Sequence, residues 1–155
     1  MSTLVTLTTD FGARDPYVAS MKGVLFQTCA GIQVIDLSHD ISPQDVLEGS
    51  LFWAGAIPFF PPGGIHVGVI DPGVGTARLP IVAVAQGHRF VCPDNGLLTL
   101  FLREHPLDEA RVISNPEFMR AKISATLHGR DVFAPAAARL ALGVPLHEVG
   151  ESLDT

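Results

Sequence analysis

The stretch "GVIDPGVGTAR", residues 68–78, joins the end of an apolar run to a glycine-rich turn and places opposite charges at its two ends. The apolar residues before Asp71 predict a buried strand, and Gly73 and Gly75 allow a tight turn after it. A turn needs only the glycines, so Asp71 and Arg78 require a separate explanation. In open α/β sheets, ligands bind in the crevice beyond the strand ends, and this stretch has the features of such an end.

The segments on either side of this stretch alternate between strand and helix patterns. Strands are predicted where β-branched and apolar residues run between turn signals, at residues 4–10, 32–38, 64–71, 80–85, 89–93 and 110–114. Helices are predicted where apolar residues recur at helical spacing or start signals occur, at residues 17–28, from 42 onward, 94–105 and 129–143. Several strands are almost continuously apolar, which is typical of a sheet covered on both faces. We therefore expect an α/β domain with a mainly parallel central sheet and helices on both faces.

Local signals give more detail for three of these elements. The Ser-Pro-Gln-Asp sequence that begins at Ser42 predicts a helix whose N-cap is Ser42. Residues 80–85 and 89–93 flank a short turn, which predicts a hairpin-like pair. The alanine-rich helix over 129–143 is expected to be interrupted at Pro135, because proline lacks the N–H that a helix interior needs.

Aspartates recur at the carboxyl ends of the predicted strands or just after them. Asp10, Asp36, Asp71 and Asp94 all occupy such positions. A single aspartate there is ordinarily a helix cap or a turn former. Four of them on one edge of a sheet indicate a binding site at that edge.

Composition limits the classes of partner. The 155 residues fit one domain, and 47% of them are hydrophobic while 17% are charged. The net charge of −6 argues against nonspecific binding to nucleic acid or to anionic membranes. The N-terminus "MSTLVTLTTDFG" has no charged region followed by a long apolar one, so we predict no signal peptide and a cytoplasmic location.

Metal-assisted phosphoester hydrolysis is one reading of the polar residues. Its candidate ligands are Asp10, His39, Asp40, Asp71, Asn95 and His128. Two-metal sites commonly use closely spaced carboxylates and imidazoles in Asp-x-His pairs, and the sequence has none. Arg78 and Arg130, close to these acids in the sequence, would also repel divalent cations. We therefore expect no metal.

Other common chemistries fit less well. The Gly-x-Gly of residues 73–75 lacks the third glycine of a dinucleotide-binding turn and follows the third strand. No Gly-x-Ser-x-Gly elbow is present, and no serine is placed as a triad nucleophile. Aspartate, arginine and histidine without a metal or a nucleophile can hold and polarise a water molecule.

Four motifs in order resemble those of the S-adenosyl-L-methionine hydroxide adenosyltransferase family, which is related to enzymes that fluorinate or chlorinate the same substrate. They are "TLTTDFGARDPYVASMKGVL" at 6–25, "VIDPGVGTAR" at 69–78, "PDNGLLT" at 93–99 and "LHGRDVFAPAAARL" at 127–140. The resemblance implies attack of water or hydroxide on the ribose C5′ of S-adenosyl-L-methionine (SAM), which gives adenosine and L-methionine without metal or cofactor.

The resemblance also assigns roles to individual residues. It implies that Asp71, Arg78 and His128 hold the water, and that Asp10 binds the ribose. Asn95, in the turn after the strand at 89–93, is expected either to shape that turn or to contact the substrate. The two carboxylate oxygens of Asp10 can each accept a hydrogen bond from one hydroxyl of a ribose diol, which agrees with its implied role.

Family members continue into a second, smaller β-rich domain and form trimers with the site at a subunit interface. The resemblance therefore implies that residues 1–155 are the N-terminal α/β domain and that the β domain is absent from this chain. Segment 59–65 and the alanine-rich helix are expected to leave apolar surface exposed. A halogenase-like enzyme and a non-catalytic module that binds adenosine or SAM remain as alternatives.

Overall fold

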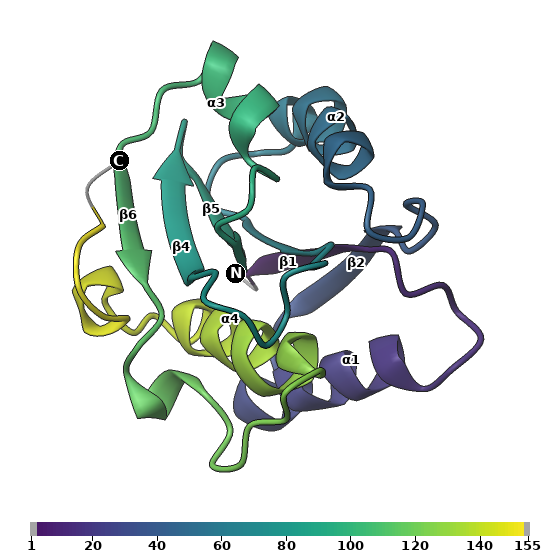
Figure 1. Cartoon of the computed structure of the whole chain (residues 1–155). Coiled ribbons are helices and arrows are strands. Elements are labelled where there is room, and N and C mark those ends of the chain that lie inside the picture. Colours follow the sequence, from purple (N-terminus) through teal and green to yellow (C-terminus); the bar gives the residue numbers. More distant parts are fainter. Residues whose placement is uncertain (1–2, 154–155) are drawn as a thin grey trace.

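Strands and helices alternate along most of the chain (Figure 1). The computed structural model describes residues 3–153. The strands are β1 (Leu4–Thr9), β2 (Gln33–Ser38), β3 (Ile65–Val69), β4 (Pro80–Ala85), β5 (His88–Pro93) and β6 (Glu109–Val112). The α-helices are α1 (Tyr17–Thr28), α2 (Val46–Ala56), α3 (Thr99–Glu104) and α4 (Ala134–Ala141). The elements thus occur where the sequence predicts them, with ends that shift by a few residues.

The strands of residues 3–153 form one six-stranded sheet in the order β2-β1-β3-β5-β4-β6. The pairings β1 with β2, β1 with β3 and β3 with β5 are parallel. β4 pairs antiparallel with β5 and with β6. The turn between β4 and β5 explains why these two strands are antiparallel, because Gln86 and Gly87 have positive φ angles of 50° and 75° and close a two-residue hairpin. The predicted α/β class and hairpin are confirmed, but the sheet is mixed.

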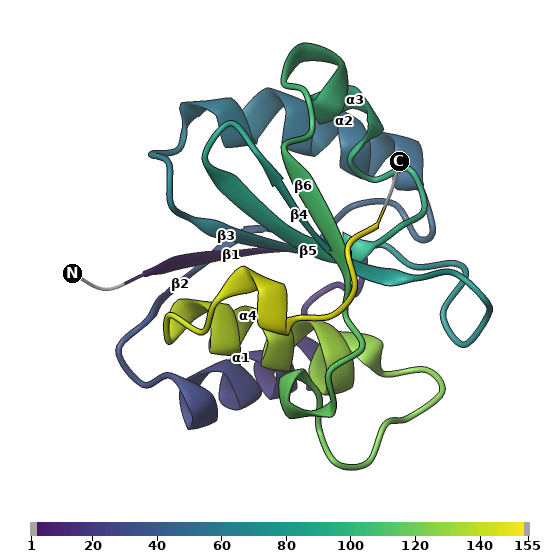
Figure 2. The same ribbon diagram turned by 90° about the vertical axis from the view of Figure 1, so that its left-hand side faces the viewer.

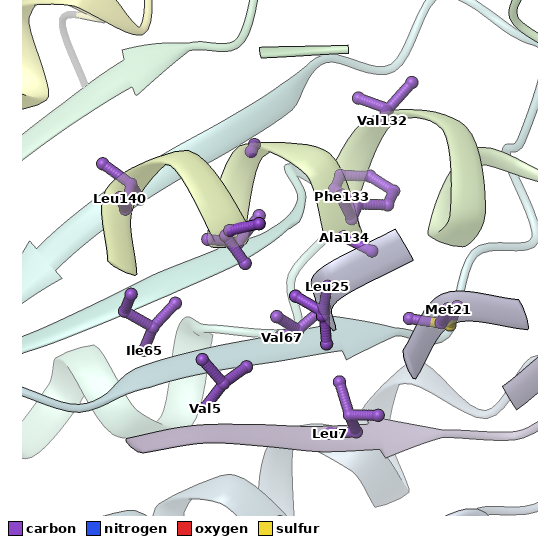
Figure 3. Close-up of a cluster of buried hydrophobic side chains, with 14 of the residues drawn as sticks. Val5, Leu7, Met21, Leu25, Ile65, Val67, Val132, Phe133, Ala134 and Leu140 are labelled. Carbon is purple, nitrogen blue, oxygen red and sulfur yellow. The ribbon is translucent and has the colours of Figure 1, made fainter. Parts of the chain in front are cut away.

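Helices cover both faces of the sheet. Figure 2 shows the sheet nearly edge-on, with α1 and α4 on one side and α2 and α3 on the other. In the first hydrophobic core, Val5 and Leu7 of β1 share a cluster with Leu25 of α1 (Figure 3). The second core contains Trp53 of α2 and Phe90 of β5. Of the helices within residues 3–153, none has the length and apolar character needed to cross a bilayer.

The start of α2 differs from the prediction. Asp45, not Ser42, is the N-cap, and its side chain accepts a hydrogen bond from the Glu48 N–H. Gln44 takes a left-handed backbone conformation with φ 64°, which separates the turn around Ser42 from the helix. The assignment of the N-cap to Ser42 was therefore wrong.

The last helix also differs from the prediction. A π-helical turn at Gly129–Phe133 runs directly into α4, so Pro135 does not interrupt the helix. Pro135 occupies the first turn of α4, where a missing N–H costs little. Most of α4 is buried against α1 and the strands β1 and β3, so the apolar surface expected on the helix over 129–143 is limited to Leu142, which is 50% exposed. Phe59 in the segment 59–65 is 88% exposed, as expected.

Candidate functional site

The parallel strands bring two of the predicted acids to the same edge of the sheet. Asp10 follows β1 and Asp71 follows β3, and these strands are neighbours with Thr9 opposite Val69. The loops after β3 and before α4 project from this side, on the right in Figure 2. Four segments far apart in the sequence line a cavity of about 180 Å³ there: Asp10, Phe11, Tyr17, Gln44, Val69, Asp71, Val74, Thr126 and His128.

The loop between Asp71 and Arg78 is closed by its own backbone. The Val74 N–H donates to the Asp71 carbonyl at 3.1 Å, which makes a turn directly after the strand. Gly75 has φ 80°, and a Cβ atom there would lie 2.9 Å from the Ala125 carbonyl oxygen. Glycine is therefore required both by the backbone conformation and by the close approach of a second loop. The two loops are held together at this contact.

Arg78 holds Asp71 and His128 at the same time. Its Nε donates to Asp71 Oδ1 at 2.9 Å, and its Nη2 donates to Asp71 Oδ2 and to His128 Nδ1, the latter at 2.8 Å. The side chains of Arg78 and Asp71 are only 9% and 5% exposed. The guanidinium also lies 5.4 Å from the centre of the Phe133 ring. The three predicted water-holding residues thus meet in a cluster that is largely shielded from solvent.

The contact with Arg78 fixes the protonation state of His128. Arginine has donors only, so His128 Nδ1 must accept, and the neutral ring carries its proton on Nε2. Burial lowers the pKa of His128 below its ordinary value, and the positive charge of Arg78 lowers it further. Asp71 opposes these effects without outweighing them. His128 is therefore neutral at pH 7, with its proton on the nitrogen that does not face Arg78.

Asp131 anchors the loop that carries His128. It lies in the π-helical turn with no exposed surface and accepts hydrogen bonds from the Ser124 N–H at 2.8 Å and from Arg130 Nε at 2.7 Å. Burial alone would raise the pKa of Asp131, but these hydrogen bonds outweigh it and the pKa is lowered. Asp131 therefore remains ionised and pairs with Arg130 near the start of the last helix.

Asp10 is oriented by the turn before α2. The Gln44 N–H donates to Asp10 Oδ2 at 2.7 Å, and the left-handed conformation of Gln44 points its N–H at the carboxylate. The segment between β2 and α2 thereby closes one side of the cavity. This arrangement fixes one oxygen of Asp10 beside the space where a ligand would bind.

Two aromatic rings also line the cavity. Phe11 and Tyr17 are stacked, with ring centroids 4.1 Å apart and planes inclined by 23°. The Tyr17 hydroxyl donates to the Thr126 carbonyl at 3.1 Å, which ties α1 to the loop before His128. Burial, together with the negative charge of Asp131, raises the pKa of Tyr17 to about 12. Tyr17 is therefore a neutral hydrogen-bond donor at physiological pH.

The remaining predicted residues lie outside this cavity. Asn95 donates to the Ile70 carbonyl at 2.9 Å and accepts from the Leu97 N–H at 3.3 Å, and with Asp94 it lines a separate cavity of about 140 Å³. Asp36 lies within β2 and pairs with His39. The Asn95 amide thus shapes the turn beside Asp71, which is one of its two expected roles. A substrate contact by Asn95 stays a prediction.

The ligand set considered for a metal is dispersed. His39 is hydrogen-bonded to Thr9 and to Asp36 and does not line the cavity that contains His128. Asn95 belongs to the other cavity. Throughout residues 3–153, no three histidine, cysteine, aspartate or glutamate side chains are grouped so that they could hold a metal ion.

Sequence reasoning did not single out six of the lining residues, of which Val69 was predicted only as part of a strand. These are Phe11, Tyr17, Gln44, Val69, Val74 and Thr126. Tyr17 offered a signal, because it is the only tyrosine in the chain and lies inside the first quoted motif. Gln44 offered none, since its role depends on a backbone conformation that its residue type does not favour.

The sequence matches a family model described as the SAM hydroxide adenosyltransferase N-terminal domain over residues 5–150. It is 44% identical over 151 residues to the (R)-S-adenosyl-L-methionine hydrolase of Salinispora arenicola (strain CNS-205), covering 97% of this chain and 58% of that protein. It is also 32% identical over 173 residues to the fluorinase of Actinoplanes sp. (strain N902-109), covering 97% of this chain and 58% of the fluorinase.

The fold is similar to that of a solved structure. A conserved protein from Thermotoga maritima superposes with a TM-score of 0.95 at 38% identity, over 97% of this chain and 58% of that one. The chain thus spans little more than half the length of the relatives it matches.

Proposed function

Because this chain belongs to the SAM hydroxide adenosyltransferase family, we propose that it carries the water-activating residues of an enzyme that hydrolyses S-adenosyl-L-methionine to adenosine and L-methionine. The observation that carries the proposal is the meeting of Asp71, Arg78 and His128 at a cavity that Asp10 also lines. Two relatives that are 44% and 42% identical over 97% of this chain are named as hydrolases of this substrate.

The reaction is a displacement at the ribose C5′. A water oxygen forms a bond to C5′ while the bond from C5′ to the sulfonium breaks, and the electron pair of that bond neutralises the sulfur. Methionine leaves as a neutral thioether, so no general acid is needed, and the water loses one proton to solvent. The protein must position the water in line with the breaking bond and favour its hydroxide form.

The hydrogen-bonding capacity of the cluster suits that task. Each Asp71 oxygen accepts one hydrogen bond from Arg78 and retains a second lone pair for a water proton. The charge of Arg78 favours an oxygen that becomes negative in the transition state. The neutral His128 ring, held through Nδ1, offers its Nε2 proton as a donor.

The charge of the cavity suits a cationic substrate. Two carboxylates, Asp10 and Asp71, and one guanidinium, Arg78, leave one net negative charge, since His128 is neutral. A sulfonium would be attracted to such a site, whereas Arg78 without Asp71 would repel it. In this proposal both oxygens of Asp10 accept from the ribose hydroxyls, since Oδ2 keeps a second lone pair beside the Gln44 N–H, and Asn95 contributes to substrate binding.

The whole protein is proposed to need more than these residues. We place residues 1–155 as its N-terminal α/β domain and expect a second, β-rich domain to complete the substrate pocket, which agrees with coverage of 58% of the relatives' length. We further propose a cytoplasmic homotrimer that uses no metal or cofactor. The net charge of −6 supports the expectation that neither nucleic acid nor a membrane is a partner.

The test is incubation with SAM in oxygen-18 water, followed by mass spectrometry of both products. Hydrolysis at C5′ places the label in the adenosine 5′-hydroxyl and leaves methionine unlabelled. Adenosine without label, or no product from a protein that contains this chain, would overturn the proposal. The reaction should continue in the presence of a chelator.

The fluorinase relative supports one second candidate, a halogenase-like reaction. The same incubation with chloride or fluoride distinguishes the two, because a halogenase yields 5′-halogenated adenosine. Binding of SAM without any product would instead favour a non-catalytic binding module.

A further inference from the structure

A chain of hydrogen bonds lies behind Asp10, outside the residues that line the cavity. Lys22 of α1 donates to Asp36 Oδ2 at 2.7 Å, and Asp36 Oδ1 lies 2.8 Å from His39 Nε2. On its other side, His39 Nδ1 lies 2.7 Å from the Thr9 hydroxyl. The chain runs from the surface of α1 to the last residue of β1, next to Asp10.

The donors and acceptors along this chain have one consistent order for a neutral imidazole. Thr9 Oγ1 accepts from the Phe11 N–H at 3.2 Å, and its own proton can then be donated to His39 Nδ1. His39 carries its proton on Nε2 and donates it to Asp36. Burial alone would raise the pKa of Asp36, but the hydrogen bonds from His39 and Lys22 lower it, so Asp36 is an ionised acceptor.

This arrangement resembles a nucleophilic triad but cannot act as one. Thr9 has no exposed surface, and its oxygen already receives the Phe11 N–H. A nucleophile needs an open side toward its substrate. The role left for this chain of hydrogen bonds is to hold the polypeptide backbone around Thr9 in place.

His39 holds the polypeptide backbone on both sides of Asp10 and Phe11. Its ring contacts the Thr9 hydroxyl before this pair, and its carbonyl accepts the Gly12 N–H at 2.8 Å after it. The residues between these two attachments supply a carboxylate and an aromatic ring to the cavity. A change at His39 would therefore be transmitted to both without any contact with a ligand.

We propose that His39, supported by Asp36 and acting through Thr9, is a positioning residue that sets the orientation of Asp10 for the two hydroxyls of the substrate's ribose. The inference rests on the proposed function only in the identity of the ligand. Two parallel hydrogen bonds to a diol demand a fixed carboxylate, so loosening Asp10 weakens recognition of the diol in particular.

The experiment compares the affinity for adenosine with that for 2′,3′-dideoxyadenosine, which lacks the diol, by calorimetric titration. In the unaltered protein adenosine should bind more tightly, and Asp10→Asn should remove most of that preference. His39→Ala and Thr9→Val should each lower the adenosine affinity about tenfold and leave the dideoxyadenosine affinity unchanged.

Conservative variants separate positioning from general stability. His39→Asn keeps a polar group near the Nδ1 position and should retain most of the preference, whereas His39→Gln keeps one near Nε2 and should lose it. Thr9→Ser keeps the hydroxyl and should bind as the unaltered protein does. His147→Gln, at an exposed histidine far along the chain, is the matched control.

Three outcomes would overturn the proposal. One is a preference for adenosine that survives in Thr9→Val and His39→Ala. The second is an equal loss of affinity for both nucleosides, which is the signature of a purely structural role. The third is no preference in the unaltered protein. None of these depends on turnover, so failure of the hydrolase proposal in the oxygen-18 assay is distinguished from failure of this one.

Discussion

At the scale of single residues, the site depends on the shape of one guanidinium group. Arg78 uses two nitrogens on Asp71 and directs one of them to His128 as well. A planar group with fixed donors can satisfy both partners without moving, which a flexible ammonium cannot. The site is therefore assembled before any substrate arrives.

Replacing Arg78 by lysine tests this dependence. Arg78→Lys keeps the charge but loses the fork, so kcat/KM for SAM hydrolysis should fall about a hundredfold, as when one positioned donor is removed. Arg103→Lys, at an exposed position on α3, is the control and should be unchanged. Activity of Arg78→Lys within a factor of about two of the unaltered protein would contradict the role assigned to the fork.

The protonation of His128 is a second prediction at this scale. Its pKa should lie below the ordinary value of 6.5, and Arg78→Gln should raise it, because the positive charge is lost while Asp71 remains. Titration of the His128 ring protons by NMR measures both values. An unchanged midpoint in Arg78→Gln would mean that the two side chains do not interact in solution.

At the scale of elements, the site is built by two loops that lie against each other. The loop after β3 carries Asp71 and Arg78, and the loop before α4 carries His128. They touch where Gly75 faces the Ala125 carbonyl. Neither loop alone brings Asp71, Arg78 and His128 together, so the site depends on the contact between the loops.

Gly75→Ala tests that contact. The variant places a methyl group against Ala125 and strains the backbone, so we expect a loss of about 1–2 kcal/mol of stability from the strain and an additional loss of turnover from displaced loops. Gly143→Ala is the matched control, because φ is 93° there but nothing lies within 4 Å of an added Cβ. Urea unfolding and initial rates measure the two effects. Equal behaviour of both variants would show that the loop contact is unimportant.

The elements also show what a sequence can and cannot predict. The acids at strand ends and the glycines between Asp71 and Arg78 are local signals, and they located the edge of the sheet where the cavity lies. The N-cap at Asp45 and the hydrogen bond from Gln44 to Asp10 were missed, because both follow from the left-handed conformation of Gln44. The π-helical turn before α4 was missed as well, since its pattern of apolar residues is that of an ordinary helix.

At the scale of the whole molecule, the sheet contains a buried pair of histidines that the site does not use. His66 Nε2 lies 3.1 Å from His88 Nδ1, and His66 Nδ1 lies 2.8 Å from the Thr6 hydroxyl. Burial, with the neighbouring His88, lowers the pKa of His66 to about 3, and burial also lowers the pKa of His88. The fold therefore keeps the His66 ring neutral in weak acid and disfavours protonation of His88.

This pair should make the fold sensitive to acid. The ordinary pKa of 6.5 applies to His66 in the unfolded chain, so below that pH the unfolded chain binds a proton that the folded one does not. The unfolding free energy should then fall by about 1.4 kcal/mol per pH unit from His66 alone, down to about pH 3. Urea unfolding between neutral pH and weak acid measures this slope.

His66→Phe should give a shallower slope whatever its effect on stability at neutral pH. His147→Gln is again the control, because His147 is exposed and lies outside the pair of His66 and His88. A slope that is the same in His66→Phe and in the unaltered protein would assign acid sensitivity to other groups.

The shielding of Asp71 and Arg78, which are only 5% and 9% exposed, also bears on ionic strength. Mobile ions screen charges in water over a Debye length of about 8 Å at physiological salt, but they do not enter a contact between two buried side chains. Added salt should therefore slow the capture of a cationic nucleoside by the net negative cavity and leave the bond-breaking step unaltered. An enzyme with this construction keeps its chemistry constant while the salt content of its surroundings varies.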